Sequence, residues 1–222
     1  EIGREDNQGK IDEQLFYCDD KNHKNRLLDH ILRDANIDQC IIFTSTKAMS
    51  EQLADELYEK GFAANCLHGD MPQNWRNRTL MDLRKGRIKV LVATDVAARG
   101  IDVPSITHVI NYDLPKQAED YVHRIGRTGR AGRHGLALTF AEVNEYMAVH
   151  KIEKYLGRKL PEFTIEGMEP TRKRSKAPRK AKGGGWKQKG GRKPSGSGKP
   201  FGRPAGSPRG KARKPAAQGR RA

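Results

Sequence analysis

Arginine and glycine alternate in the stretch HRIGRTGRAGR, residues 123–133, with spacing that suits phosphate binding. Glycines stand at positions 126, 129 and 132, between the four arginines Arg124, Arg127, Arg130 and Arg133. The guanidinium group stays charged at neutral pH and presents a rigid fork of donors that fits phosphate oxygens. Glycine lets the backbone come close to a ligand. We therefore expect this stretch to bind phosphate, although a solvated repeat that binds nucleic acid non-specifically would have the same local composition.

Polar residues also follow several short apolar runs. TSTK follows CIIF, Asp95 and the run VAARGIDVP follow KVLVAT, and QNWRNR comes after CLHGDM, while the arginine-glycine run precedes GLALTF. In open parallel sheets, ligands bind at the carboxyl ends of the strands. If the apolar runs are parallel strands, we expect the functional residues to lie at that edge.

Two periodicities alternate over the first 160 residues. Short apolar, β-branched runs predict buried strands at 14–18, 40–44, 63–67, 89–94, 106–111 and 135–140. Between most of them lie helical patterns, which predict helices at 24–34, 47–59, 73–85 and 143–156. This alternation predicts an α/β fold, an open parallel sheet with helices on both faces.

Charge divides the chain into parts of different character. Residues 170–222 hold 19 of the 43 Lys and Arg and none of the 27 Asp and Glu, so the remaining residues carry 24 − 27 = −3. We expect a linker at 1–12, the domain at 13–160 and a disordered basic Gly/Pro/Lys/Arg-rich tail at 161–222, because such a composition cannot bury enough apolar surface to fold. The charge density of the tail suits a polyanion, above all nucleic acid, and Trp186 and Phe201 could stack on bases. A merely solubilising tail is the alternative.

Several classes of protein are disfavoured. Cys18, Cys40 and Cys66 lie far apart without a CxxC pair, which argues against a disulfide framework or a zinc site, and the histidines show no ligand spacing. The sequence has no membrane-length apolar run and no signal peptide. We expect no metal ligands and no membrane contact, and a reducing, cytoplasmic location. The chain opens without methionine, as a piece of a longer protein would.

Four motifs carry a resemblance to a known family. HGDMPQNWR, VLVATDVAARGID, VINYDLP and YVHRIGRTGRAG stand in this order. Together they resemble the second RecA-like domain of DEAD-box ATP-dependent RNA helicases, over about residues 10–160. More weakly, KIEKYLGRKLPEFTIEGMEP with a basic tail after it is similar to the bacterial RhlE branch. The resemblance implies a RecA-like fold.

The resemblance implies a nucleotide site. Arg127 and Arg130 would be arginine fingers that reach the γ-phosphate of ATP when two domains close, and His123 and Arg124 would help to join the two domains. Asp102 would bind a ribose hydroxyl. Magnesium would be held mainly by the first RecA-like domain.

The resemblance also implies a surface for RNA, single-stranded or in a short duplex, that contacts the backbone. The residues implied in this surface are Thr46, Gln73, Arg76, Thr94 and Gly100. Backbone contacts do not depend on base sequence. We expect Asp95 and Arg99 to brace their loop, and Phe43 to belong to the core.

Motifs of the first RecA-like domain are absent from the 222 residues. There is no G-x-x-x-x-G-K-[ST] loop, D-E-A-D or S-A-T motif, and GSGKP at 196–200 lacks the required spacing. We therefore expect the second half of an ATP-dependent RNA helicase, inactive alone, whose partners are RNA and the first RecA-like domain. The alternatives are a stand-alone RNA-binding or annealing module, in which the tail dominates, and an enzyme complete in itself. The sequence indicates no oligomeric state.

Overall fold

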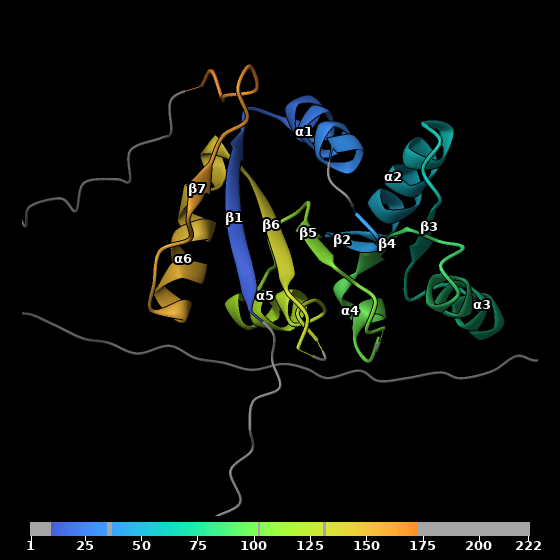
Figure 1. Cartoon of the computed structure of the whole chain (residues 1–222). Coiled ribbons are helices and arrows are strands. Elements are labelled where there is room, and N and C mark those ends of the chain that lie inside the picture. The colour runs from blue at the N-terminus through green and yellow to red at the C-terminus, as the bar shows by residue number, and fades with distance from the viewer. Residues whose placement is uncertain (1–9, 35–36, 102, 131, 173–222) are drawn as a thin grey trace, which may run out of the picture. The chain divides into compact units, whose positions relative to one another are not determined.

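A computed structural model describes residues 10–172 of the chain, apart from residues 35, 36, 102 and 131. Strands and helices alternate along these residues (Figure 1). The strands are β1 (Ile11–Cys18), β2 (Cys40–Thr44), β3 (Ala64–Leu67), β4 (Val90–Thr94), β5 (His108–Asn111), β6 (Gly135–Glu142) and β7 (Glu162–Phe163). The helices are α1 (Lys21–Asp34), α2 (Lys47–Glu59), α3 (Gln73–Arg84), α4 (Asp95–Ala98), α5 (Ala118–Ile125) and α6 (Tyr146–Leu156), with a 3-10 turn at Val143–Glu145.

The described strands form one parallel sheet in the order β3-β4-β2-β5-β6-β1-β7. All five residues of β2, an interior strand, are buried, as expected of a strand covered on both faces. Thr44 at the end of β2 lies opposite Thr94 at the end of β4. All carboxyl ends therefore meet at one edge of the sheet, which we call the carboxyl edge, and all amino ends meet at the opposite, amino edge.

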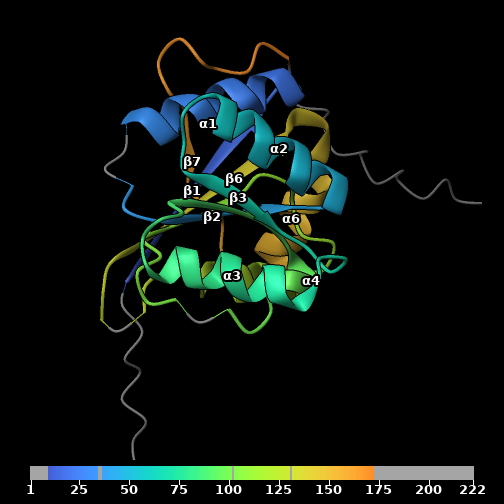
Figure 2. The same ribbon diagram turned by 90° about the vertical axis from the view of Figure 1, so that its right-hand side faces the viewer.

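Helices cover both faces of the sheet. Helices α1 and α2 lie above it in Figures 1 and 2, and α3 and α4 lie below. The first face packs Leu27 and Leu28 of α1 and Leu53 of α2 against the sheet in one apolar cluster. The opposite face has one cluster with α3 and α4 and another with α5 and α6. These layers confirm the predicted α/β architecture. No helix among the described residues is both long and apolar enough to span a membrane.

Local sequence signals predict most elements well. Every predicted strand is present, and α2 has the predicted bounds. Its first turn is capped by Thr46, whose hydroxyl accepts from the Met49 N–H at 3.1 Å, and the chain leaves it through Gly61 with φ at 87°. The short elements α4, α5 and β7 are missing from the prediction, because each offers too few residues for a periodic pattern to show.

Both predicted domain boundaries need correction. Strand β1 begins at Ile11, inside the predicted linker, and β7 pairs with β1 beyond the predicted end at residue 160. The chain then remains packed on the domain as far as Arg172, where its backbone N–H donates to Asp19. Disorder was therefore the wrong prediction for 161–172, since Ile165 and Met168 of this segment pack against the core and Gly167 lies in a turn between them. The rest of the predicted tail, 173–222, lies outside the described residues.

Candidate functional site

Three of the residues expected to bind RNA follow neighbouring strands at the carboxyl edge. Thr94 ends β4, Thr46 lies two residues beyond β2, and Gly100 follows α4 with φ at 80°. This positive φ favours glycine, because a Cβ would strain the backbone there. Thr46 and Gly100 are exposed, and Thr94 is half-buried. Strand order alone therefore brings these residues together, since β4 and β2 are adjacent.

Helix α3 brings the other two RNA-side residues to the same edge. Gln73 opens the helix and is exposed, and the Arg76 side chain turns back to donate to the carbonyl of His68 at 3.0 Å. His68 directly follows β3, which pairs with β4. The N-terminus of a helix carries partial positive charge that favours phosphate. The five predicted RNA residues thus span the ends of three adjacent strands, β3, β4 and β2.

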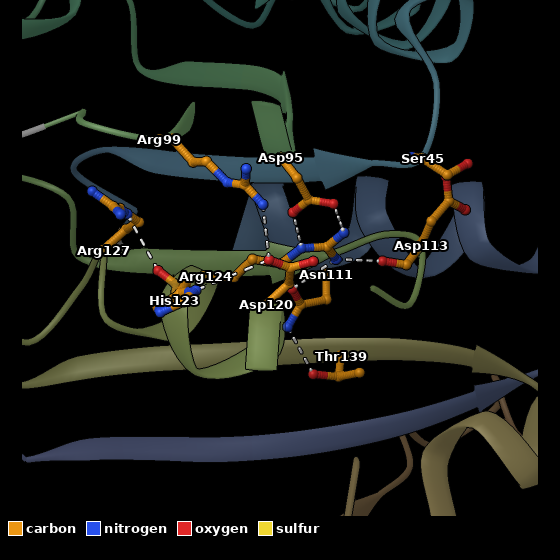
Figure 3. A network of polar contacts seen from close by, with 10 residues as sticks. All are labelled: Ser45, Asp95, Arg99, Asn111, Asp113, Asp120, His123, Arg124, Arg127 and Thr139. Atoms are coloured by element: carbon orange, nitrogen blue, oxygen red, sulfur yellow. Dashed lines mark hydrogen bonds and ion pairs between the residues drawn. The ribbon is translucent and has the colours of Figure 1, made fainter. Parts of the chain in front are cut away.

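Arg124 is the centre of a buried polar network (Figure 3). Its side chain is 2% exposed, and it binds the Asp95 carboxylate through two hydrogen bonds of 2.6 and 2.8 Å. It also donates to the Asn111 side chain at 3.2 Å and to the Asp113 carbonyl at 2.6 Å. The guanidinium lies 4.9 Å from the ring centroid of Phe43, within the range of a cation–π interaction.

This network connects the carboxyl ends of three strands, β2, β4 and β5. Phe43 is 2% exposed, so the prediction that it belongs to the core is confirmed. Asp95 holds Arg124 beside it, which agrees with a bracing role for Asp95. Within the described part of the chain, Arg124 makes its contacts inside its own domain, and its expected part in joining two domains stays a prediction.

The two arginines expected to reach ATP lie in the loop after α5. Arg127 donates to the carbonyl of Ile101 at 2.7 Å and to the carbonyl of His123 at 3.2 Å, while Arg130 donates to the carbonyl of Gly126 at 2.9 Å. Both side chains are half-buried, and the His123 side chain is 71% exposed. The Ile101 contact brings the arginine loop beside the residue before Asp102. Asp102 itself lies outside the described residues.

A cleft opens between this loop and α4. Its lining includes Asp95, Arg99, Asp120, His123 and Arg127. Arg99 reaches across to Asp120 at 3.4 Å, so an ion pair joins its two walls (Figure 3). The cleft has a volume of about 20 Å³, room for no more than a water molecule, and two carboxylates, Asp95 and Asp120, lie among its cationic groups.

The arginine loop lies away from the carboxyl edge, contrary to the expectation from the strand pattern. The Thr128 hydroxyl bonds to the carbonyls of Ile106 and Thr107, both of which precede β5, and Gly135 opens β6. These contacts belong to the amino edge. The reason is topological: parallel strands need a crossover that returns the chain to the amino edge, and the loop ends the crossover between β5 and β6.

Close packing fixes the arginine loop in place. A Cβ built on Gly135 would lie 2.6 Å from the Gly129 nitrogen and 2.7 Å from the Thr128 side chain. Gly129 has φ at 67° and is buried. The loop therefore packs directly against the start of β6. Glycine is required at position 135 because a Cβ would clash with the loop, and not because of its backbone conformation.

Sequence reasoning missed Asp113 as a residue that positions the site. Its carboxylate accepts from the Ser45 N–H at 2.9 Å and lies 3.7 Å from the buried ammonium of Lys24, while its carbonyl accepts from Arg124. Asp113 thus connects the loop containing Thr46 with the Arg124 network. The available signal was its place just after a strand, in VINYDLP, the same position that singled out Asp95.

Comparison with known proteins places the chain in a class. Residues 23–132 match the family described as "Helicase conserved C-terminal domain". The ATP-dependent RNA helicase SrmB of Escherichia coli is 39% identical over 161 residues, which are 72% of this chain and 36% of SrmB. The ATP-dependent RNA helicase RhlB of Pectobacterium carotovorum is 45% identical over 152 residues, 68% of this chain and 35% of RhlB. The chain therefore spans about a third of the length of these relatives.

Solved structures agree in both fold and sequence. A crystal structure of the E. coli DEAD-box protein SrmB bound to regulator of ribonuclease activity A gives a TM-score of 0.72 at 38% identity, covering 77% of this chain and all of the other. The C-terminal domain of the DEAD-box protein Dbp5 gives 0.64 at 37% identity, covering 68% of this chain and 89% of that one. Dbp5 of S. cerevisiae bound to RNA and ADP BeF3 gives 0.64 at 36% identity, covering 69% and 41%. The fold is thus the RecA-like fold of helicase C-terminal domains. The chain belongs to the DEAD-box RNA helicase family, as its C-terminal helicase domain, and the bacterial relatives agree with the bacterial branch expected from its sequence.

Proposed function

We propose that this domain is the second half of an ATP-dependent RNA helicase and that it supplies Arg127 and Arg130 to the γ-phosphate of ATP. One observation carries the proposal: Arg127 donates to the carbonyl of Ile101, so the arginine loop lies against the segment that leads to Asp102. Arg127 and Ile101, 26 residues apart in sequence, therefore meet in space, and Ile101 directly precedes Asp102 in the chain.

The residues present fit a nucleoside triphosphate. Arg127 and Arg130 are held half-buried at the loop, with guanidinium groups suited to phosphate oxygens, and Asp102 would take a ribose hydroxyl. Bound ATP would supply the phosphoanhydride bond that is hydrolysed, with its Mg²⁺ held mainly by the first RecA-like domain. An arginine inserted from another domain contributes about 10³ to 10⁵ in rate in GTPases. His123, exposed beside the cleft, would contact the first domain.

The carboxyl edge would hold RNA in the same cycle. Thr46, Gln73, Arg76, Thr94 and Gly100 would bind the RNA backbone over β3, β4 and β2, and the basic tail would add non-specific affinity. The two functions are coupled through one rigid network, because Arg124 binds the segments that begin at Asp95 and Asp113. We propose that the protein acts in the cytoplasm.

Substitution in the complete two-domain protein tests the role of the arginines. Arg127→Ala and Arg130→Ala are each expected to lower RNA-stimulated ATP turnover at least about a thousandfold, while RNA binding survives. Arg133→Ala, with the same charge change at an exposed position in the same loop, is the matched control and is expected to keep turnover. The 222-residue chain alone is expected to hydrolyse no ATP. Turnover by Arg127→Ala at the level of the control would refute the assignment.

A further inference from the structure

One cation of helix α1 is buried inside the domain. Lys24 is 4% exposed, whereas Lys21 of the same helix is half-buried and Arg26 and Arg33 are exposed. An ammonium group loses its hydration when it is buried, and only nearby charges or acceptors can offset this cost. A methionine has nearly the same length and would fill the space without the cost. The charge at position 24 therefore needs a reason beyond packing.

Three carboxylates at the carboxyl edge surround the Lys24 ammonium. Its Nζ lies 3.7 Å from Asp113 Oδ1, 4.0 Å from Glu142 Oε1 and 3.6 Å from Glu145 Oε2. Asp113 lies two residues beyond β5, Glu142 ends β6, and Glu145 belongs to the 3-10 turn that follows β6. Like charges repel, so a cation between them is what allows three carboxylates to lie around one point.

Asp113 holds the chain where it leaves β2, through two hydrogen bonds. Its N–H donates to the Phe43 carbonyl at 3.1 Å, and its carboxylate oxygen Oδ2 accepts from the Ser45 N–H at 2.9 Å. The other carboxylate oxygen, Oδ1, is the one that faces Lys24. A single carboxylate therefore connects the buried cation with the segment that leaves β2.

The residue after Ser45 is Thr46, which we expect to bind an RNA phosphate. The Thr46 hydroxyl oxygen accepts from the Met49 N–H at 3.1 Å as the cap of α2. A hydroxyl that accepts in this way keeps its own hydrogen for another acceptor. That hydrogen points reproducibly at a phosphate oxygen only if the backbone of Ser45 and Thr46 is held in place. The α2 cap holds it on one side, and the Asp113 carboxylate holds it on the other.

Removal of the Lys24 ammonium would leave the Asp113 carboxylate beside two other carboxylates with no cation between them. Repulsion would then favour rotation of the Asp113 side chain, which is 23% exposed and has a route to solvent. This rotation would take Oδ2 away from the Ser45 N–H. The Lys24 side chain is itself only 5% exposed, too deeply buried to contact RNA. Its effect on RNA binding therefore passes through Asp113.

We propose that Lys24 is a positioning residue for RNA binding: its ammonium holds the Asp113 carboxylate in the orientation that fixes Ser45 and Thr46 at the carboxyl edge. This inference rests on the proposed RNA binding. Helix α1 supplies none of the five residues expected to bind RNA, and through Lys24 it takes part in their arrangement.

RNA-stimulated ATP turnover of the complete two-domain protein tests this role. The rate is measured against the concentration of a single-stranded RNA of about ten nucleotides, within the site sizes of single-strand binders. Lys24→Met is expected to raise the half-saturating RNA concentration about three- to tenfold, which corresponds to the loss of about one hydrogen bond. The half-saturating ATP concentration at saturating RNA should change less than about twofold. Partial unfolding lowers the maximal rate but moves neither concentration, so a purely structural role predicts no change in either.

Lys21→Met is the matched control. It removes the same charge from the same helix one turn earlier, where the Lys21 ammonium donates to the Gln52 side chain at 3.4 Å. We expect it to move the half-saturating RNA concentration less than about twofold, because exposed charges are screened by salt. An equal rise in Lys21→Met and Lys24→Met would overturn the proposal, since the loss of positive charge near the edge would then explain the effect. Equal rises for RNA and ATP in Lys24→Met would overturn it too.

A double-mutant cycle tests whether Lys24 acts through Asp113. Asp113→Ala leaves the Lys24 ammonium with two carboxylates and should raise the half-saturating RNA concentration by about the same three- to tenfold. The double variant should bind RNA no more weakly than Asp113→Ala alone, because the acceptor that Lys24 positions is already gone. Effects that multiply would overturn the proposal. Lys24→Gln, which loses the charge but keeps polar groups, should match Lys24→Met and replaces it in the cycle if Lys24→Met does not fold.

Hydrogen exchange at the Ser45 amide checks the contact directly in the 222-residue chain. The amide should exchange about tenfold faster in Lys24→Met and at the unaltered rate in Lys21→Met, and an unaltered rate in both would contradict the proposal. Failure of the proposed function has a different signature. If RNA does not stimulate ATP turnover by the unaltered protein, the RNA function fails and the positioning role with it. If RNA stimulates turnover but Lys24→Met leaves the half-saturating RNA concentration unchanged, only the positioning role fails.

Discussion

Replacing Arg124 by alanine should destabilise the domain more than any other single change in the arginine-glycine stretch. The guanidinium is 2% exposed and makes four hydrogen bonds, two of them to Asp95. Its removal leaves the Asn111 amide oxygen without this donor and the Asp95 carboxylate without its cation. Breaking a buried ion pair by removing one partner costs about 3–5 kcal/mol. Since domains are stable by only about 5–15 kcal/mol, Arg124→Ala should remove a large part of the stability of the domain.

Urea denaturation followed by circular dichroism measures this change. For an m-value of about 2 kcal/mol/M, a loss of 3–5 kcal/mol lowers the midpoint by roughly 2 M. Arg133→Ala is the matched control: its side chain is exposed, and such surface changes stay within about 0.5 kcal/mol. Arg124→Ala combined with Asp95→Ala should cost less than the two single changes summed, because the second change removes a charge that the first left unpaired.

The outcome decides between two roles for Arg124. A midpoint equal to that of Arg133→Ala would refute the reasoning and would return Arg124 to the role expected from the family motif, contact with another domain. A large shift means that any loss of ATP turnover by Arg124→Ala in the complete protein would include a loss of folded protein, so it could not be interpreted as the loss of a contact with another domain.

The other two predictions concern packing and pH. Gly135→Ala places a Cβ 2.6 Å from the Gly129 nitrogen and should cost about 1–3 kcal/mol in thermal unfolding, whereas Gly69→Ala, with nothing within 4 Å of its Cβ, is the control and should change little; equal unfolding temperatures would contradict the contact. Burial alone would raise the pKa of Asp19, but the N–H groups of Thr171 and Arg172 lower it from 3.8 to about 2. Because the folded-state pKa lies below the unfolded value, the hydrogen bonds from Thr171 and Arg172 to the Asp19 carboxylate contribute their full stability above about pH 4 and lose it as pH falls toward 2. The Thr171 amide resonance in NMR should therefore titrate with a midpoint near 2, and a midpoint near 4 would show that these hydrogen bonds do not form.

Much of the fold could be predicted because its signals are local. The run CIIFT is buried throughout as β2, and helix α2 begins and ends where its apolar spacing predicts. Parallel order then brings the ends of β2 and β4 together without further information, which places Thr46 and Thr94 at one edge. Their position at the ends of strands could be predicted because the period of a strand depends on near neighbours in sequence, whereas their expected part in RNA binding came from the resemblance to a known family.

The different roles of the four arginines could not be predicted in the same way. Arg124, Arg127, Arg130 and Arg133 look equivalent as a repeat, but burial and partners distinguish them: Arg124 is buried against Asp95, Arg127 and Arg130 are half-buried in the loop, and Arg133 is exposed. The partners of Arg124 lie 11 to 29 residues away in sequence. A repeat shows only the spacing of residues along the chain. It does not show which of the four arginines is buried.

The sequence alone determined the class of fold, the order of strands and helices, the charge of the tail and the motifs of a DEAD-box C-terminal domain. Only the tertiary structure decided that Arg127 lies against Ile101, that Arg124 is buried in its own domain, and that residues 161–172 return to bind Asp19, 152 residues away from Thr171. The physical reason is the range of the interactions. Periodicity and capping are set within a turn or a strand, whereas these three features depend on contacts that exist only once the sheet has brought distant segments to the same place.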